Sequence, residues 1–256
     1  MSKLLQCVFV MPAYNEQDCI ELVVNRWLAE GKRLFGDQFR LVVVNDGSKD
    51  STGAILDKVA QGNSMLVVVH QKNGGHGAAL IAAYRKALSL GTEYVFHVDS
   101  DDQFIPADFP KLWEKRDDSK FILGNRSQRH DAFHRLVITR ILKVFVALVF
   151  GVWIDDCNVP YRLIEARYLR QLLDGVPNTV FAPNIFLSIL AAKQGQKTFG
   201  IPVTHEDRKT GQVSIIKWKL ISVCLLSVRE LIQFRLALSG LVKRINQMEY
   251  SLEASE

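Results

Sequence analysis

The residues best suited to chemistry in this sequence form the acidic segment Asp99-Ser100-Asp101-Asp102-Gln103. The segment follows a run of strand-forming residues, and Pro106 lies shortly after it. Carboxylates at alternate positions of an extended segment can converge on one divalent cation where the strand turns, and Mg²⁺ and Mn²⁺ prefer such oxygen ligands. We therefore predict a Mg²⁺ or Mn²⁺ site whose cation would neutralise a departing diphosphate. A solvated acidic loop is the alternative interpretation.

Two further polar clusters follow predicted strands. Pro12-Ala13-Tyr14-Asn15-Glu16 stands where a dinucleotide-binding domain would carry a GxGxxG turn, which argues against a dehydrogenase. Tyr14 could stack on a base, and Glu16 could accept hydrogen bonds from a ribose. In Asn45-Asp46-Gly47-Ser48, the Asp46 carboxylate could accept from a base N–H, and the glycine lets the backbone approach a ligand. Each cluster alone is equally compatible with an ordinary turn.

A glycine-rich loop, Lys72-Asn73-Gly74-Gly75-His76-Gly77, precedes a predicted helix. Glycines such as Gly74 and Gly77 expose backbone N–H groups, and a helix N-terminus favours an anion. The loop lacks the GK[ST] sequence of a Walker loop. It therefore predicts a phosphate-facing loop of another type, in which His76 faces either a phosphate or solvent.

The elements that must position these clusters alternate between strands and helices. Runs rich in β-branched residues predict buried strands, namely Leu5–Met11, Arg40–Asn45, Met65–His70 and Tyr94–Asp99. Segments of helical length and spacing lie between them, namely Asp18–Phe35, Ser51–Gln61 and Gly77–Leu90. This alternation predicts an α/β domain with a mainly parallel sheet flanked by helices, and a ligand site at the carboxyl ends of the strands.

The pattern changes near residue 126. Phe133–Ile154 and Ile215–Leu241 have the character of long amphipathic helices, and in residues 126–256 Lys and Arg outnumber Asp and Glu by 18 to 11. The apolar run Val144–Ile154 has 11 residues, whereas a bilayer span needs about 20, so we expect no transmembrane segment here. A basic, apolar-rich half suits an anionic membrane surface. A buried helix with a solvated basic face and the interface of a homo-oligomer are the alternatives.

Composition limits the class of protein. The chain has 256 residues, 48% hydrophobic and 23% charged, as in a folded globular protein. Its four cysteines show no CxxC pairing and no nearby histidine in ligand spacing, which predicts a reducing, cytoplasmic location and no structural zinc. The N-terminal apolar run lacks a cleavage pattern, so we interpret it as a strand rather than a signal peptide. Nucleic acid is not an expected partner, because the basic residues alternate with apolar runs and no binding motif occurs.

Together, the motifs PAYNE, VVNDGS, NGGHGAA and DSDDQ occur in a characteristic order and spacing. The sequence closely resembles family 2 inverting glycosyltransferases of the GT-A fold. Within them it looks most like the dolichol-phosphate mannosyltransferase and polyprenyl-phosphate hexosyltransferase branch, over roughly residues 5 to 220. The resemblance implies a GT-A domain over residues 1–214, with a nucleotide-sugar half (1–125) and an acceptor half (126–214). An amphipathic helix and tail (215–256) would follow.

The resemblance also implies roles for individual residues. Asp46 would recognise the base, Asp99 would contact the ribose or sugar, and Asp101 and Gln103 would ligate Mg²⁺ or Mn²⁺. The residues expected to bind the nucleotide-sugar are Pro12, Tyr14, Glu16, Asp46, Gly74, Gly77, Asp99, Arg208 and Ser214. Those expected at the acceptor are Arg126, Arg135, Asp156 and Arg162, with Arg129 and His134 nearby. The residues expected to carry catalysis are Asp99, Asp101, Arg126 and Arg162.

Three later segments carry the resemblance into the second half. Gly124-Asn125-Arg126 matches the family's small-x-Arg element, Asp156–Arg162 resembles Asp-x-x-x-Gly-(Phe/Tyr)-Arg, and Arg208–Ser214 resembles Arg-x-x-Gly-x-Ser. Pro160 replaces the usual glycine of the second segment, and Asn184 stands where a glutamate is common. The sequence also ends without the transmembrane pair that many relatives append. These departures concern the acceptor more than the donor.

The expected reaction is a single displacement at the anomeric carbon of a GDP- or UDP-linked hexose. A phosphate monoester acceptor needs no general base, since its second pKa is about 6 and it is largely dianionic at neutral pH. It needs cations, so Arg126 and Arg162 are expected to bind a lipid phosphate, and Arg208 with Lys209 the donor diphosphate. Such an enzyme would lie in the cytoplasm or peripherally on the cytoplasmic face of a membrane.

Three alternatives remain at this stage. A saccharide hydroxyl acceptor would need a carboxylate base, for which Asp102, Asp155 and Asp156 are candidates. A nucleotidyltransferase would need a glycine-rich phosphate loop directly after the first strand, where PAYNE stands. A nucleotide-binding module without activity would be expected to lose the acidic motif, which is intact here.

Overall fold

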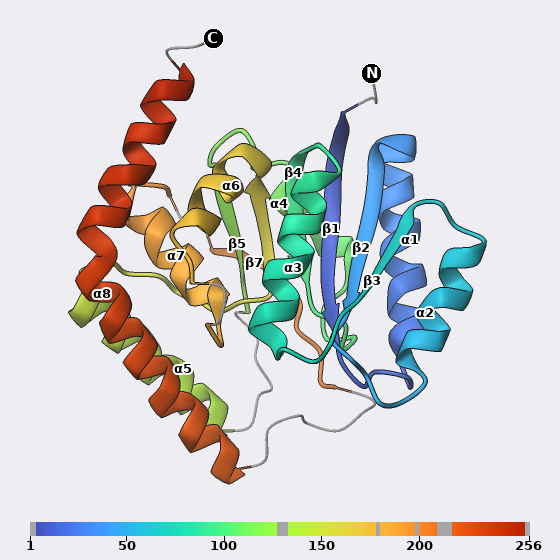
Figure 1. Cartoon of the computed structure of the whole chain (residues 1–256), viewed down its shortest axis with the longest axis horizontal. Coiled ribbons are helices and arrows are strands. Elements are labelled where there is room, and N and C mark those ends of the chain that lie inside the picture. The colour runs from blue at the N-terminus through green and yellow to red at the C-terminus, as the bar shows by residue number, and fades with distance from the viewer. Residues whose placement is uncertain (1–3, 127–132, 178–179, 198–199, 209–216, 254–256) are drawn as a thin grey trace.

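The protein is built on one seven-stranded mixed sheet with the strand order β3-β2-β1-β4-β6-β5-β7 (Figure 1). The structure is a computed structural model. It describes residues 4–126, 133–177, 180–197, 200–208 and 217–253, and within these ranges the side chains of 133–138, 217–225 and 248–253 lie outside the description. The site residues Arg129, Arg135, Lys209 and Ser214, with His134, therefore fall outside the described side chains.

The first half of the chain forms the parallel part of the sheet. The strands β1, β2, β3 and β4 pair in parallel and span Leu5–Ala13, Phe39–Asn45, Leu66–His70 and Thr92–Val98. The helices α1, α2 and α3 connect them and span Ile20–Phe35, Thr52–Gln61 and His76–Ser89, with a 3₁₀ turn η1 at Gly36–Gln38. Every predicted strand and helix of this half is present, with each end within two residues of the expected position. The parallel strands bring their carboxyl ends to one edge of the sheet.

The second half completes the sheet with one reversed strand. The later elements are η2 (Pro106–Asp108), α4 (Phe109–Trp113), β5 (Phe121–Asn125), β6 (Tyr161–Glu165), α6 (Ala166–Asp174), α7 (Pro183–Lys193) and β7 (Gly200–Pro202). β6 lies between β4 and β5 and runs antiparallel to both, whereas β5 and β7 are parallel. The reversal pairs Tyr161 with Val98, so the segment before β6 arrives beside the acidic motif that follows β4.

An aromatic cluster holds the two central strands in place. The ring of Phe9 in β1 contacts those of Trp27, Phe39, Phe96 and Phe109 at centroid distances of 4.7–5.8 Å. All five side chains are essentially buried, and burying one such ring contributes about 1.5–3 kcal/mol to folding. Because the cluster joins β1 and β4 to α1 and α4, it fixes the strands whose carboxyl ends carry the PAYNE and DSDDQ motifs.

Two long helices lie at one side of the sheet (Figure 1). α5 spans Phe133–Phe150 and ends at Gly151, which has a φ of 64°, so it is shorter than the predicted helix. α8 spans Lys217–Glu253, longer than predicted. The Phe234 ring of α8 lies 6.1 Å from that of Phe150 and 4.8 Å from that of Phe186 in α7, so α8 packs on both helices. Among the described residues, no helix combines the length and the apolar character that a bilayer span requires.

Candidate active site

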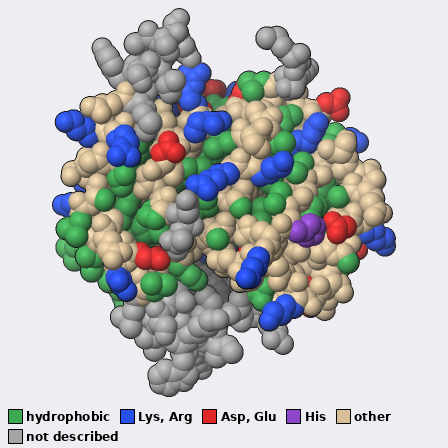
Figure 2. Space-filling model, viewed as in Figure 1, with side chains coloured by type: hydrophobic (Ala, Val, Ile, Leu, Met, Phe, Trp, Pro, Cys, Tyr) green, Lys and Arg blue, Asp and Glu red, His purple; other side chains and the backbone are tan. Residues whose placement is uncertain are grey.

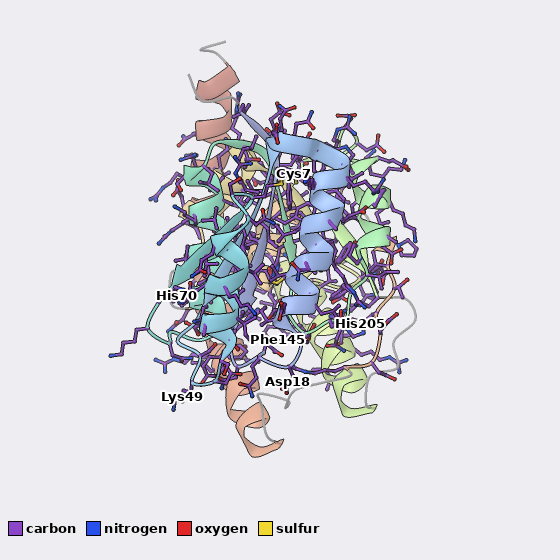
Figure 3. All side chains as sticks on the ribbon, turned by 90° about the vertical axis from the view of Figure 1, so that its right-hand side faces the viewer. Cys7, Asp18, Lys49, His70, Phe145 and His205 are labelled. Carbon is purple, nitrogen blue, oxygen red and sulfur yellow. The ribbon has the colours of Figure 1, made fainter. Side chains whose placement is uncertain are left out.

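The loops that follow β1 and β2 are joined by hydrogen bonds at the carboxyl edge of the sheet. Figure 3 shows their residues Asp18 and Lys49 at one end of the molecule, opposite Cys7 of β1. The backbone N–H of Asn15 donates to Ser48 Oγ at 3.0 Å, and that of Lys49 donates to Asn15 Oδ1 at 2.8 Å. Asn15 has a φ of 56°, a left-handed conformation that asparagine tolerates. The two loops therefore form one wall.

The Asp46 carboxylate shapes the glycine-rich loop after β3. It accepts hydrogen bonds from the backbone N–H groups of Gly74 and Gly75 at 2.8 and 2.9 Å, and from Gln71 Nε2 at 2.7 Å. Asp46 is buried, and an ionised carboxylate has about four acceptor positions. Three of these acceptor positions are used by hydrogen bonds within the protein, which leaves one for a further donor such as a base N–H.

Gly77 allows close packing at the start of α3. It is buried at the start of α3, and a Cβ atom at this position would lie 2.0 Å from the carbonyl oxygen of Val180. The absence of a side chain lets α3 approach the segment before α7. The predicted contact of Gly77 with the nucleotide-sugar would therefore have to come from its backbone, whereas Gly74 lies on the exposed part of the loop.

The acidic motif is held at the end of β4 by its own polar residues. Ser100 Oγ donates to the carbonyl of Pro12 at 2.9 Å, which ties the ends of β1 and β4 together. Gln103 Nε2 donates to the carbonyl of Glu206 at 3.0 Å, while Asp102 forms an ion pair with Arg26 at 2.7 Å. Asp101 and Gln103 remain together, since the Gln103 N–H lies 3.4 Å from Asp101 Oδ1.

Three carboxylates concentrate negative charge at this edge. Burial and the neighbouring Asp99 raise the pKa of Asp101 to about 7. Burial also raises the pKa of Glu16, although Arg208 opposes the shift. Burial disfavours ionisation of Asp99, but His97, His76 and Arg126 together lower its pKa. Such a group of carboxylates favours a cation in its midst.

Arg208 is the cation that meets this group within the protein. Its Nη2 lies 2.6 and 2.5 Å from the two carboxylate oxygens of Glu16, 192 residues earlier in the chain. His205, three residues before it, packs its ring on Phe104 at 5.0 Å, and Figure 3 shows His205 toward the same end of the molecule as Asp18. The structure thus brings Arg208 to the predicted donor pocket.

Arg126 and Asp156, both expected at the acceptor, pair with each other. Arg126 Nε and Nη2 donate to the two oxygens of Asp156 at 2.8 and 3.0 Å, a bidentate ion pair. The Arg126 side chain is 16% exposed and that of Asp156 is 3% exposed. The pair joins the end of β5 to the segment before β6, so two of the residues expected at the acceptor do lie together.

Arg162 is fully buried, and this corrects its expected contact with an acceptor phosphate. Its guanidinium donates to the carbonyls of Cys157, Val159 and Asn184 and to Ser188 Oγ at 2.7–3.3 Å. These five hydrogen bonds use all five of its N–H donors. Arg162 therefore positions the segment before β6 and α7 and presents nothing to a ligand. Asn184 lies beside Arg162 and is also buried. The Tyr84 hydroxyl donates to its Oδ1 at 3.5 Å, so this side chain too bonds within the protein.

Sequence reasoning missed His97, a histidine in an otherwise apolar strand. It is fully buried, its Nε2 lies 3.3 Å from Asp99 Oδ1, and neither ring nitrogen has a well-formed hydrogen bond within the described residues. Burial lowers the pKa of His97 to about 4, so the ring is neutral at physiological pH. Its cross-strand partner is Arg162. The only sequence signal was a polar residue at a core position.

Replacing His97 by leucine is expected to separate stability from donor binding. The protein should keep its stability or gain about 1 kcal/mol, because a buried polar group without good partners disappears. The affinity for the nucleotide-sugar should fall about tenfold, because Asp99 loses its 3.3 Å contact with the His97 ring. Urea unfolding and nucleotide-sugar titration measure the two effects, and His97→Gln, which keeps a donor, should restore part of the affinity. An unchanged affinity for the nucleotide-sugar in His97→Leu would mean that His97 has no role in donor binding.

The metal prediction can be tested against this donor set. Within the described residues, no group of three or more His, Cys, Asp and Glu side chains is arranged to hold a metal. Magnesium is usually held by one or two carboxylates with substrate phosphates completing its shell. Asp101 and Gln103 fit that arrangement, and they do not fit a metal cage made by the protein alone.

The model of the family described as glycosyl transferase family 2 matches residues 8–173. The chain belongs to glycosyl transferase family 2. Among curated relatives, the chain is similar to the undecaprenyl-phosphate 4-deoxy-4-formamido-L-arabinose transferase of Edwardsiella ictaluri, with 28% identity over 217 residues. That match covers 84% of this chain and 64% of the relative. The enzyme of the same name from Klebsiella pneumoniae (strain 342) is 26% identical over the same shares. The chain thus spans less than two thirds of these relatives' length.

Two solved structures show the same fold. Glucosyl-3-phosphoglycerate synthase from Mycobacterium tuberculosis, in complex with Mn²⁺, UDP and glucosyl-3-phosphoglycerate, superposes with a TM-score of 0.64. It is 17% identical, and the match covers 90% of this chain and 80% of that one. The mannosyltransferase PcManGT from Pyrobaculum calidifontis, in complex with GDP-Man and Mn²⁺, gives 0.56 at 19% identity and covers 82% and 59%. The predicted family and the predicted GT-A type of α/β fold are confirmed.

Proposed function

We propose that this glycosyltransferase moves a hexose from a GDP- or UDP-linked donor to a polyprenyl phosphate, with a divalent cation at Asp101 and Gln103. The observation that carries the proposal is the acidic motif at the carboxyl edge of the sheet, with Arg208 on its donor side and Arg126 on its acceptor side. The names of the curated relatives support the acceptor. The Mn²⁺, UDP and GDP-Man bound in the solved structures support the donor and the cation.

The donor would lie across the loops after β1, β2 and β3. Tyr14 is half-buried beside these loops, and Asp46 keeps one acceptor position for a base. The cation, when bound, neutralises charge on the departing diphosphate. Arg208 lies beside Glu16 and next to the acidic motif, where it would bind the same diphosphate. Asp99, which lies beside His97, would accept hydrogen bonds from the ribose or the sugar.

The acceptor phosphate would attack the anomeric carbon from the side opposite the diphosphate. One bond forms between a phosphate oxygen and the anomeric carbon, and the bond from that carbon to the diphosphate oxygen breaks. No proton needs to move, since the acceptor is already ionised near neutral pH. Arg126 would hold that phosphate, with Asp156 fixing the guanidinium in place. Arg162 supports the segment that carries Asp156.

A saccharide hydroxyl acceptor is less well supported by the site. It would need a carboxylate free to accept a proton. The three candidates are all ion-paired, Asp102 with Arg26, Asp155 with Lys143 and Asp156 with Arg126, at 2.6–2.8 Å. Each of these carboxylates is already engaged with a cation of the protein, so the phosphate acceptor, which needs no base, is the better match.

A transfer assay tests the proposed function. Purified protein with Mn²⁺ or Mg²⁺ is incubated with labelled GDP- and UDP-hexoses, with and without a short polyprenyl phosphate in detergent. We expect label in the organic phase only when metal and lipid are both present, and EDTA should abolish it. Donor turnover into water-soluble saccharide products, without lipid product, would replace the proposed acceptor. A protein that binds no donor from a complete panel would contradict the proposal.

Cation affinity is expected to depend on pH through Asp101. Its pKa of about 7 in the metal-free protein means that the carboxyl is protonated below that pH. A cation must then displace a proton, so Mn²⁺ affinity should fall about tenfold for each pH unit below 7 and level off above it. Calorimetric titration of Mn²⁺ from pH 5.5 to about 8 measures the slope. Asp101→Asn should bind Mn²⁺ weakly, with an affinity that no longer depends on pH in this way. The same dependence on pH in that variant would mean that another group releases the proton.

A further inference from the structure

The outer sides of α5 and α8 carry exposed apolar residues that the fold does not use. The set called here the α5–α8 apolar face consists of Ile141, Val144, Leu148, Ile232 and Leu236, which are 49–81% exposed. Within each helix these residues recur at intervals of three or four, so they lie along one stripe. Figure 2 shows hydrophobic side chains gathered along the left-hand edge of the molecule, where α8 runs, with Lys and Arg beside them. Exposed apolar stripes of this kind mark an interaction surface.

The two stripes are neighbours. Arg235 Nε donates to the carbonyl of Val149 at 2.9 Å, which joins the helices directly next to Leu148 and Leu236. The opposite sides of both helices are already packed, since Phe150 and Phe234 are buried against each other. Leu148 and Leu236 are each 81% exposed, so their apolar surface is in excess of what the core requires.

The charge around this face is predominantly positive, although Lys143 is paired with Asp155, which follows α5, at 2.6 Å. In the described side chains of residues 139–150 and 226–247 there are six basic residues and one acidic residue. The acidic one, Glu230, is turned inward, where it accepts from the backbone N–H of Phe181 at 3.2 Å. At the end of α5, Trp153 is 65% exposed and the Lys143 ammonium lies 4.4 Å from its ring centre. The six basic residues are Arg140, Lys143, Arg229, Arg235, Lys243 and Arg244.

We propose that the α5–α8 apolar face docks on an anionic lipid bilayer. Apolar side chains would enter the boundary between headgroups and acyl chains, and the basic residues around them would meet lipid phosphates. A second copy of this chain fits less well, because pairing the same face twice would bring two clusters of positive charge together. Figure 1 shows α5 and the first half of α8 at the end of the sheet that carries the active-site loops. The inference rests on the proposed function only for its biological purpose, which is access to a lipid acceptor.

Co-sedimentation with vesicles tests the proposal. The intact chain is mixed with vesicles of phosphatidylcholine containing roughly one third phosphatidylglycerol, and separately with vesicles of phosphatidylcholine alone. We expect binding to the anionic vesicles that is at least about tenfold tighter and that weakens at high salt. The double variant Leu148→Glu/Leu236→Glu should lose most of that binding. Leu22→Glu is the matched control, since Leu22 is 50% exposed on α1, at the other side of the sheet.

The outcomes are distinguishable. Absence of binding to anionic vesicles, or equal binding by the double variant and the wild type, would overturn the docking surface. A concentration-dependent dimer that dissociates in the double variant, without vesicle binding, would overturn it in favour of a second copy. Circular dichroism and donor binding in the double variant establish that it is folded. Transfer to a short polyprenyl phosphate in detergent should survive the double substitution, so failure of the docking proposal and failure of the proposed function give different results.

Discussion

Replacing Asp101 by asparagine is expected to lower sugar transfer at least about 100-fold. The amide keeps the shape of the side chain but removes the charge that would hold the cation, and a cation on a departing diphosphate contributes several kcal/mol to catalysis. Each 1.4 kcal/mol corresponds to about one factor of ten in rate. The loss should appear in kcat, because the charge on the diphosphate develops as the bond to the anomeric carbon breaks. Steady-state kinetics at saturating donor measure it.

A matched substitution separates this effect from a change in overall charge. Asp117→Asn removes the same charge from a side chain that follows α4, is 76% exposed and pairs with Arg116. It should transfer sugar at the wild-type rate. If Asp101→Asn retained more than about a tenth of the activity while Mn²⁺ still bound with wild-type affinity, the cation would be held elsewhere and the assignment of Asp101 would fail.

Replacing Arg162 by methionine is expected to cost about 3 kcal/mol or more of folding free energy. Methionine fills much of the volume but donates nothing, so the Val159 carbonyl loses both of its side-chain donors. The carbonyls of Cys157 and Asn184 keep only the Ser188 hydroxyl as a side-chain donor. Each buried carbonyl left without a donor costs about 1–3 kcal/mol. The side chain also carries charge in a fully buried position, where burial lowers the pKa of Arg162. Urea unfolding followed by circular dichroism measures the loss.

The control for Arg162 is another arginine in a surface ion pair. Arg33 contacts Glu30 at 2.7 Å and is 61% exposed, so Arg33→Met should change the unfolding free energy by less than about 1 kcal/mol. Arg162→Lys keeps the charge but offers fewer donors, and it should fall between the two. An Arg162→Met protein as stable as the wild type would mean that the cavity rearranges to satisfy those carbonyls.

The first half of the chain could be predicted well because its signals are local. β2, for example, contains the apolar run Leu41–Val44, which is typical of a buried strand. The polar residues Asn45 and Asp46 mark the end of that strand in the sequence. The parallel arrangement of such strands then implies that their terminal polar residues share one edge. The sequence alone therefore predicts that Glu16, Asp46 and Asp101 lie at the same edge of the sheet.

The second half was harder, because its decisive contacts are distant in the sequence. Arg162 sits in a motif that reads as an anion-binding element, yet the strand that carries it is inserted into the middle of the sheet, where neighbours from α7 bury it. No local pattern reveals that insertion. The pairing of Glu16 with Arg208 is likewise invisible in sequence, since 192 residues separate the two side chains. The close packing of Gly77 on the segment before α7 could not be predicted either, because glycine serves both close packing and ligand approach.

The insertion of β6 has a consequence for the order in which the chain folds. β5 joins the sheet through β6 and β7, and neither of these strands has been made when β5 leaves the ribosome. The first four strands can pair as they emerge, because each meets a neighbour that is already present or that follows shortly. Contacts of high sequence separation form late and slowly. During synthesis, the part of the sheet made by β1 to β4 is therefore expected to form first, while the apolar β5 waits for about 36 further residues before a partner strand exists.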